Sequence, residues 1–112
     1  MKKIEATLES FRLDKVKEAL LAIGIPGLTV STVTTHGRRL ERTESFRGAN
    51  YVVDYVPEIV IEVVVDDFKV GQVVHAIRAV ARSGQTCEGT IRIVPIDEAI
   101  RVRTGERGSS AL

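Results

Sequence analysis

The alternation of apolar and polar residues predicts strands in four separate parts of the chain, because side chains at every second position of a strand share one face. These segments are 2–9, 28–34, 58–65 and 90–96. The segment 58–65 is nearly all apolar. It is therefore expected to be buried on both faces or at a subunit contact.

Helical spacing separates the first and second strands and also the third and fourth. Residues 13–23 place apolar side chains on one face, and Gly24 follows as a typical residue after a helix end. The second helix is predicted to begin at a cap formed by Asp66 or Asp67 and to end at Gly84.

This order of elements predicts an α+β ferredoxin-like βαββαβ domain, with both helices on one face of an antiparallel sheet. The other face of the sheet is then left bare. An apolar strand in the middle of that face favours a homo-oligomer that covers it.

A long polar segment, 37–57, lies between the second and third strands. It is rich in arginine and acidic residues and also carries Phe46, Tyr51 and Tyr55. Compact domains rarely contain about 15 or more residues without regular structure unless the segment has a function. We expect it to lack regular structure and to dock on a partner.

The last part of the chain also alternates, over 100–104. An extended strand there would point the side chains of Arg101 and Arg103 the same way and turn Val102 inward. Paired guanidinium groups suit phosphate, although paired arginines more often form a solvated edge. Residues 105–112 are expected to fray.

Composition narrows the function classes. The chain has 112 residues, which suits one domain, and its 16 Lys+Arg against 15 Asp+Glu leave no basic excess for nucleic acid. A single cysteine, Cys87, and no evident leader or apolar span suit a cytoplasmic protein. Membrane association would come through a transporter partner.

Catalysis is not supported by any motif. There is no nucleophile elbow, no Walker loop and no pair of histidines at metal-ligand spacing, so neither catalytic nor metal-binding residues are predicted. A small ferredoxin-like enzyme and a purely structural oligomerisation module remain as alternatives from other classes.

Several short motifs together resemble the PII signal-transduction family over the whole chain. They are Gly37-Arg38, Phe46-Arg47-Gly48-Ala49-Asn50-Tyr51, Gly89, and Ile100-Arg101-Val102-Arg103-Thr104-Gly105-Glu106. The resemblance implies a single regulatory domain that forms a trimer and binds ADP, AMP or ATP, with Mg as a possible companion, between subunits. It makes 37–57 the partner-docking T-loop, about 82–90 the nucleotide loop and about 97–112 the C-terminal tail.

The resemblance also implies roles for single residues. Nucleotide would be held by Thr29, Gly37, Arg38, Glu62, Val64, Gly89, Arg101 and Arg103. Arg47 and Tyr51 would serve partner docking, and Tyr51 matches a tyrosine that some members modify.

Three positions that the resemblance assigns to the binding of small anions depart from the family pattern. Arg39 replaces a glutamine, and Glu58 and Thr90 replace lysines. The loss of positive charge puts a 2-oxoglutarate response in doubt, while the fork of Arg39 suits bicarbonate. The partner is then an ammonium transporter or nitrogen enzyme in a standard reading, or a component of carbon uptake or metal export in a specialised one.

Overall fold

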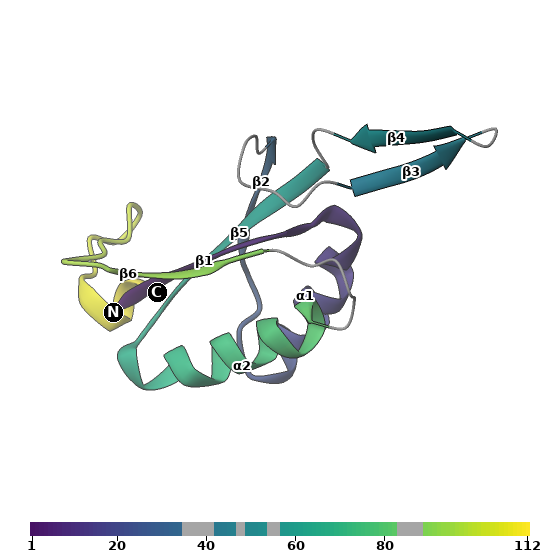
Figure 1. Ribbon diagram of the computed structural model, residues 1–112. Helices are drawn as coiled ribbons and strands as arrows, with labels where there is room; N and C mark the ends of the chain where they lie inside the picture. Colours follow the sequence, from purple (N-terminus) through teal and green to yellow (C-terminus); the bar gives the residue numbers. More distant parts are fainter. Residues whose placement is uncertain (35–41, 47–48, 54–56, 83–88) are drawn as a thin grey trace.

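A computed structural model describes residues 1–34, 42–46, 49–53, 57–82 and 89–112 (Figure 1). Its main sheet contains four antiparallel strands in the order β2-β5-β1-β6. These strands are β1 (Lys2–Glu9), β2 (Thr29–Thr34), β5 (Pro57–Val65) and β6 (Ile91–Pro95). Helices α1 (Leu13–Ala22) and α2 (Val70–Ala81) cover one face of the sheet, so the predicted ferredoxin-like arrangement is confirmed (Figure 1).

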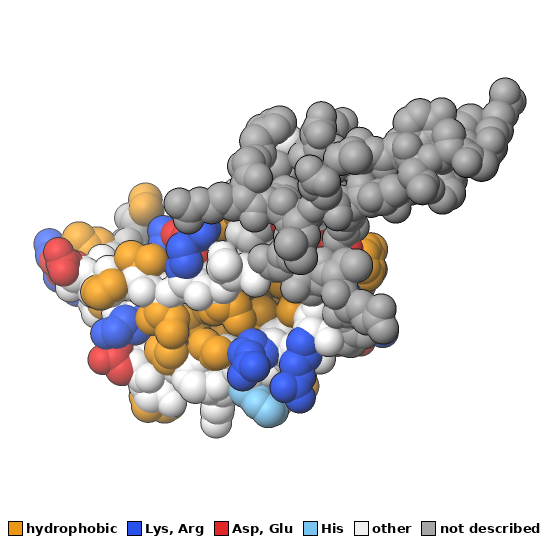
Figure 2. Space-filling model, in the orientation of Figure 1, with side chains coloured by type: hydrophobic (Ala, Val, Ile, Leu, Met, Phe, Trp, Pro, Cys, Tyr) orange, Lys and Arg blue, Asp and Glu red, His pale blue; other side chains and the backbone are white. Residues whose placement is uncertain are grey.

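The core lies between the two central strands and the helices. Every second residue of β1 and β5 points toward the helices, which is the period of two expected of strands. The buried apolar residues are Ile4, Ala6 and Leu8 of β1, Ile59, Ile61, Val63 and Val65 of β5, Val16 and Leu20 of α1, Val73, Ala76 and Ile77 of α2, and Ile25 beyond the end of α1. Hydrophobic side chains gather between the sheet and the helices in the space-filling view (Figure 2). Burial of these apolar side chains is the main stabilising contribution to the fold.

The opposite face of β5 carries Val60, Glu62 and Val64, which are only partly buried within one chain. Burial on both faces is therefore not achieved by a single copy of this domain. The predicted subunit contact would cover this bare face and would account for the apolar character of β5.

The start of α2 differs from the prediction. A short 3-10 helix, η2 (Asp67–Lys69), precedes α2, and neither Asp66 nor Asp67 forms a side-chain cap. Both carboxylates are engaged by other parts of the chain. The helix ends at Ala81, and the predicted stop at Gly84 lies outside the described residues.

The expectation that 37–57 lacks regular structure is wrong. Strands β3 (Arg42–Phe46) and β4 (Ala49–Val53) form a two-stranded antiparallel sheet in which Arg42 pairs with Val53 and Phe46 with Ala49.

The tail prediction is also wrong. Residues 102–104 form a turn in which Val102 is fully exposed, and Ile100 makes only an isolated bridge to Arg107. Positive φ angles at Gly105 and Gly108 reverse the chain, which glycine does without a steric penalty. The chain then ends in an ordered 3-10 helix, η3 (Gly108–Ala111), instead of fraying.

Candidate functional site

A groove of about 630 Å³ lies at the edge of the main sheet formed by β2. This volume is within the range of roughly 300–1,000 Å³ that small-molecule sites occupy. The groove is lined by the segment from Gly24 to Thr29, the segment from Glu62 to Asp66, Lys69 and Leu112.

Two strands place the polar side chains of the groove. Thr29 of β2 lies directly opposite Glu62 of β5, and Val64 follows two residues later on the same face of β5. The hydroxyl can donate or accept a hydrogen bond, and the carboxylate can accept one from an amino group. Together with the apolar Val64, these groups suit a flat, nitrogen-containing ring.

Beyond Glu62, Glu5 of β1 lies opposite it in the sheet, and Arg92 of β6 lies opposite Glu5. Glu5 accepts from Lys3, with Nζ and Oε1 2.8 Å apart, and from Arg92, with Nε and Oε2 3.3 Å apart. Hydrogen bonds from Lys3 and then from Arg92 hold the pKa of Glu5 below its ordinary value. The charge of Glu5 is thus balanced by its neighbours.

A second group of polar side chains lies at the other end of β5. Glu9, Arg12 and Glu58 are 8%, 6% and 6% exposed, and Glu9 and Glu58 are opposite each other in the β1–β5 register. The guanidinium of Arg12 donates to the carbonyl oxygen of Val80 at 3.0 Å and lies 3.6 Å from a Glu9 oxygen. Glu58 is therefore a buried acid beside Glu9, in a group to which Arg12 supplies a positive charge.

Gly89 approaches β1 so closely that a Cβ atom there would lie 1.9 Å from the carbonyl oxygen of Thr7. The adjacent Thr90 accepts a hydrogen bond from the Thr7 N–H at 3.1 Å, while its side chain is exposed. This close packing against β1 accounts for the glycine without any ligand, and no local sequence pattern indicates it.

The tail returns to the groove through Arg101. Its guanidinium lies 3.5 Å from a Glu106 oxygen and donates to the main-chain oxygen of Leu112 at 3.3 Å. Leu112 is one of the residues that line the groove. Arg103 is exposed in the turn, so the two arginines do not share one face of an extended strand.

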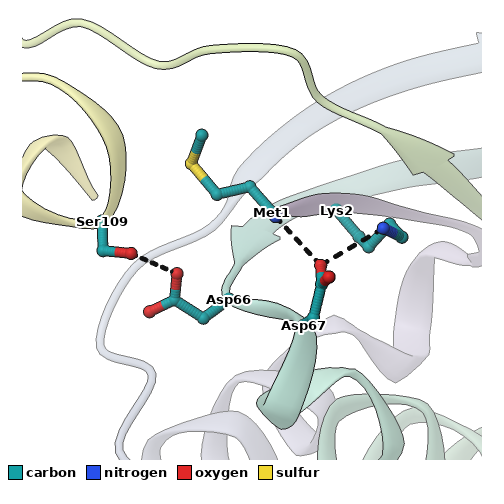
Figure 3. A network of polar contacts seen from close by, with 5 residues as sticks. All are labelled: Met1, Lys2, Asp66, Asp67 and Ser109. Carbon is teal, nitrogen blue, oxygen red and sulfur yellow. Dashed lines mark hydrogen bonds and ion pairs between the residues drawn. The ribbon is translucent and has the colours of Figure 1, made fainter.

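Two aspartates beside the groove fix the ends of the chain (Figure 3). Asp67 accepts from the Met1 amino group at 2.9 Å and from Lys2 at 3.2 Å, and these contacts, the first above all, hold the pKa of Asp67 below its ordinary value. Asp66 accepts from the hydroxyl of Ser109 at 2.5 Å. Sequence reasoning missed Asp66, Ser109 and Leu112, since the segment that contains Ser109 was expected to fray.

Other kinds of site find no support in the described part of the chain. It contains no cluster of three or more His, Cys, Asp or Glu side chains suited to a metal ion. Within the same residues, no helix is long and apolar enough to cross a membrane.

Comparison with known proteins decides the family. The model of the nitrogen regulatory protein P-II family matches residues 1–106. The chain belongs to the P-II family. Proteins named nitrogen regulatory protein P-II are similar to it over 112 residues and the full length of both chains, with identities of 46% in Azospirillum brasilense, 48% in Rhodospirillum rubrum and 49% in Cereibacter sphaeroides.

The structure brings together three of the residues that the P-II resemblance assigns to nucleotide, namely Thr29, Glu62 and Val64. Arg101 reaches the same groove through Leu112. Gly89 and Thr90 instead precede β6, at the opposite edge of the sheet from β2. Gly37, Arg38, Arg39, Arg47 and most of the 82–90 loop lie outside the described residues, as does the side chain of Tyr51.

Proposed function

We propose that this chain is a regulatory protein that binds adenine nucleotides and controls a membrane transporter or a metabolic enzyme through the T-loop. The meeting of Thr29, Glu62 and Val64 in one groove carries the proposal. Its hydroxyl, carboxylate and apolar groups suit an adenine base, which offers an exocyclic amine, ring nitrogens and a flat face.

A homotrimer would complete this site. The groove lies at the β2 edge, whereas Gly89 and the nucleotide loop lie at the β6 edge, so one chain does not bring the two together. Contact between the β2 edge of one copy and the β6 edge of the next is heterologous, and such contacts close into rings. A ring would also cover the bare sheet face around Val60 and Val64.

Regulation is favoured over catalysis by the chemistry of the groove and by the names of the relatives. Thr29 and Glu62 are opposite each other in the groove, but no hydrogen bond joins this hydroxyl to this carboxylate, so the contact by which a base activates a nucleophile is not made there. The β3–β4 hairpin within the T-loop gives a partner an edge on which to dock. Nucleic acid remains an improbable partner because the net charge is only +1.

Among the small ligands, we propose that ADP or AMP binds at least as well as Mg-ATP and that 2-oxoglutarate does not enhance binding. Thr90 brings no positive charge for a terminal phosphate. Glu58 places a carboxylate where the resemblance has a lysine, so a dicarboxylate would lose a cationic partner there. Bicarbonate at Arg39 is the alternative effector, as the anion suited to a guanidinium fork.

The double variant Arg101→Ala/Arg103→Ala tests the phosphate side of the proposal. We expect it to weaken ADP binding by about 1.5–3 kcal/mol per lost contact, because charge-assisted hydrogen bonds are the strong ones. Calorimetry measures the loss, and light scattering on the same samples should give an unchanged trimer.

The matched control is Arg78→Ala, which removes an exposed arginine from α2, away from the groove. It is expected to bind ADP as the unchanged protein does. Equal affinity for ADP in the double variant and in this control would reject Arg101 and Arg103 as phosphate ligands.

A further inference from the structure

The end of the tail forms one side of the groove. Leu112 lines the groove together with Thr29, Glu62 and Val64. It remains 44% exposed to solvent. The groove still holds about 630 Å³ with Leu112 in place. Leu112 is therefore a wall of the groove and not a plug.

Contacts on both sides of η3 hold this wall in position. The Gly108 N–H donates to the carbonyl oxygen of Ala99 at 2.9 Å, and Arg101 donates to the main-chain oxygen of Leu112. Between these two contacts, Ser109 donates to Asp66, which is itself a lining residue of the groove (Figure 3). The Ser109–Asp66 hydrogen bond is thus the side-chain contact that joins the tail directly to the opposite wall.

Asp66 is also well placed to resist movement. It directly follows β5, and its neighbour Asp67 is tied to Met1 and Lys2 at the start of β1. The carbonyl oxygen of Asp66 accepts from the Lys69 N–H at 3.0 Å. The tail is therefore fastened to a fixed point of the sheet.

We propose that Ser109 and Asp66 form a latch that positions Leu112 as an apolar wall against the nucleoside of a bound adenine nucleotide. This inference rests on the proposed function. A wall that is ordered before binding spares the ligand the entropy of ordering it, so breaking the latch lowers affinity. Ser109 and Asp66 act through Leu112 and are positioning residues.

The test is the binding of ADP and of adenosine to Ser109→Ala, measured by calorimetry. We expect both ligands to bind about 5- to 10-fold more weakly, since the latch acts on the nucleoside side and a factor of ten corresponds to one lost hydrogen bond of ordinary strength. Ser109→Thr keeps the hydroxyl and Asp66→Asn keeps an acceptor oxygen, so both should retain most of the affinity.

Ser110→Ala is the matched control, because Ser110 is the exposed neighbour of Ser109 in the same 3-10 helix. It should bind both ligands as the unchanged protein does. The double variant Ser109→Ala/Asp66→Ala should bind no more weakly than Asp66→Ala alone if the two residues act as a unit. Equal affinities in Ser109→Ala and Ser110→Ala would overturn the latch.

A reporter at the wall gives a second, independent measurement. The chain contains no tryptophan, so Leu112→Trp introduces a single tryptophan, whose emission can be excited apart from that of Tyr51 and Tyr55. ADP should change its emission in the latched protein, and by much less when Ser109→Ala is added. An emission that ADP leaves unchanged would place Leu112 away from the nucleoside and overturn the inference.

Failure of the latch and failure of the proposed function give different results. If the unchanged protein binds ADP and Ser109→Ala binds it equally, only the latch is wrong. If the unchanged protein binds neither ADP nor adenosine, the proposed function is wrong and the latch is rejected with it. Arg103→Ala distinguishes the phosphate side of the site from the nucleoside side. It should weaken ADP binding and leave adenosine binding unchanged.

Discussion

Replacing Arg12 with alanine is expected to lower the free energy of unfolding by about 3–5 kcal/mol, because removing one partner of a buried charged group leaves the others uncompensated. Arg12 is 6% exposed and lies between Glu9 and the carbonyl oxygen of Val80. Without it, Glu9 loses its guanidinium partner while it lies beside a second buried acid, Glu58, in the β1–β5 register.

Denaturant unfolding at one fixed protein concentration measures the effect, since stability depends on concentration in an oligomer. Lys15→Ala is the control, because Lys15 is an exposed residue of α1, and it should change stability by less than about 0.5 kcal/mol. A loss below about 1 kcal/mol in Arg12→Ala would mean that the acids do not depend on Arg12.

Replacing Gly89 with alanine is expected to destabilise the protein by about 1–3 kcal/mol, the usual consequence of forcing an extra carbon into a packed site. The new Cβ would lie 1.9 Å from a backbone oxygen of Thr7. A backbone atom cannot rotate away as a flexible side chain does, so β1 or the start of β6 must move. Thermal unfolding and amide exchange at Thr7 are the measurements.

Gly71→Ala is the matched control for the same chemical change. Gly71 lies in α2, and no atom approaches its Cβ position within 4 Å. Alanine there should stabilise the protein by about 0.4–1 kcal/mol, because it restricts the unfolded chain and favours the helix. An equal effect of the two substitutions would contradict the close approach at Gly89.

Regular periodicity explains which parts of the fold could be predicted. Ile59, Ile61, Val63 and Val65 alternate because one face of β5 meets the helices, so the strand could be found from the sequence. Gly24 at the end of α1 has φ +85°, as its place in the pattern indicated.

Long-range contacts explain the errors. Ile100 and Val102 alternate like strand residues, but the turn at Gly105 leaves them without a partner strand, and no local pattern signals that turn. Asp66 and Asp67 have the residue type of helix caps, yet they bind Ser109 and the start of β1, which lie 43 and 65 residues away.

The candidate site was predicted only through the family resemblance. Thr29, Glu62 and Val64 are ordinary strand residues, and nothing in their spacing indicates a ligand. The groove exists because β2 and β5 pair in a register that sets Thr29 against Glu62. Leu112 could not have been added from sequence, since its place depends on the folded tail.

Binding of adenine nucleotide is the central claim, and a calorimetric titration of ADP into the unchanged protein tests it directly. We predict saturable binding with one site per chain, at least as tight as that of Mg-ATP, with excess 2-oxoglutarate leaving the Mg-ATP affinity unchanged. A titration without measurable heat of binding for ADP or Mg-ATP, checked by equilibrium dialysis, would contradict the central claim. Tighter Mg-ATP binding in the presence of 2-oxoglutarate would instead contradict the assignment of Glu58 and Thr90 as positions that remove that response.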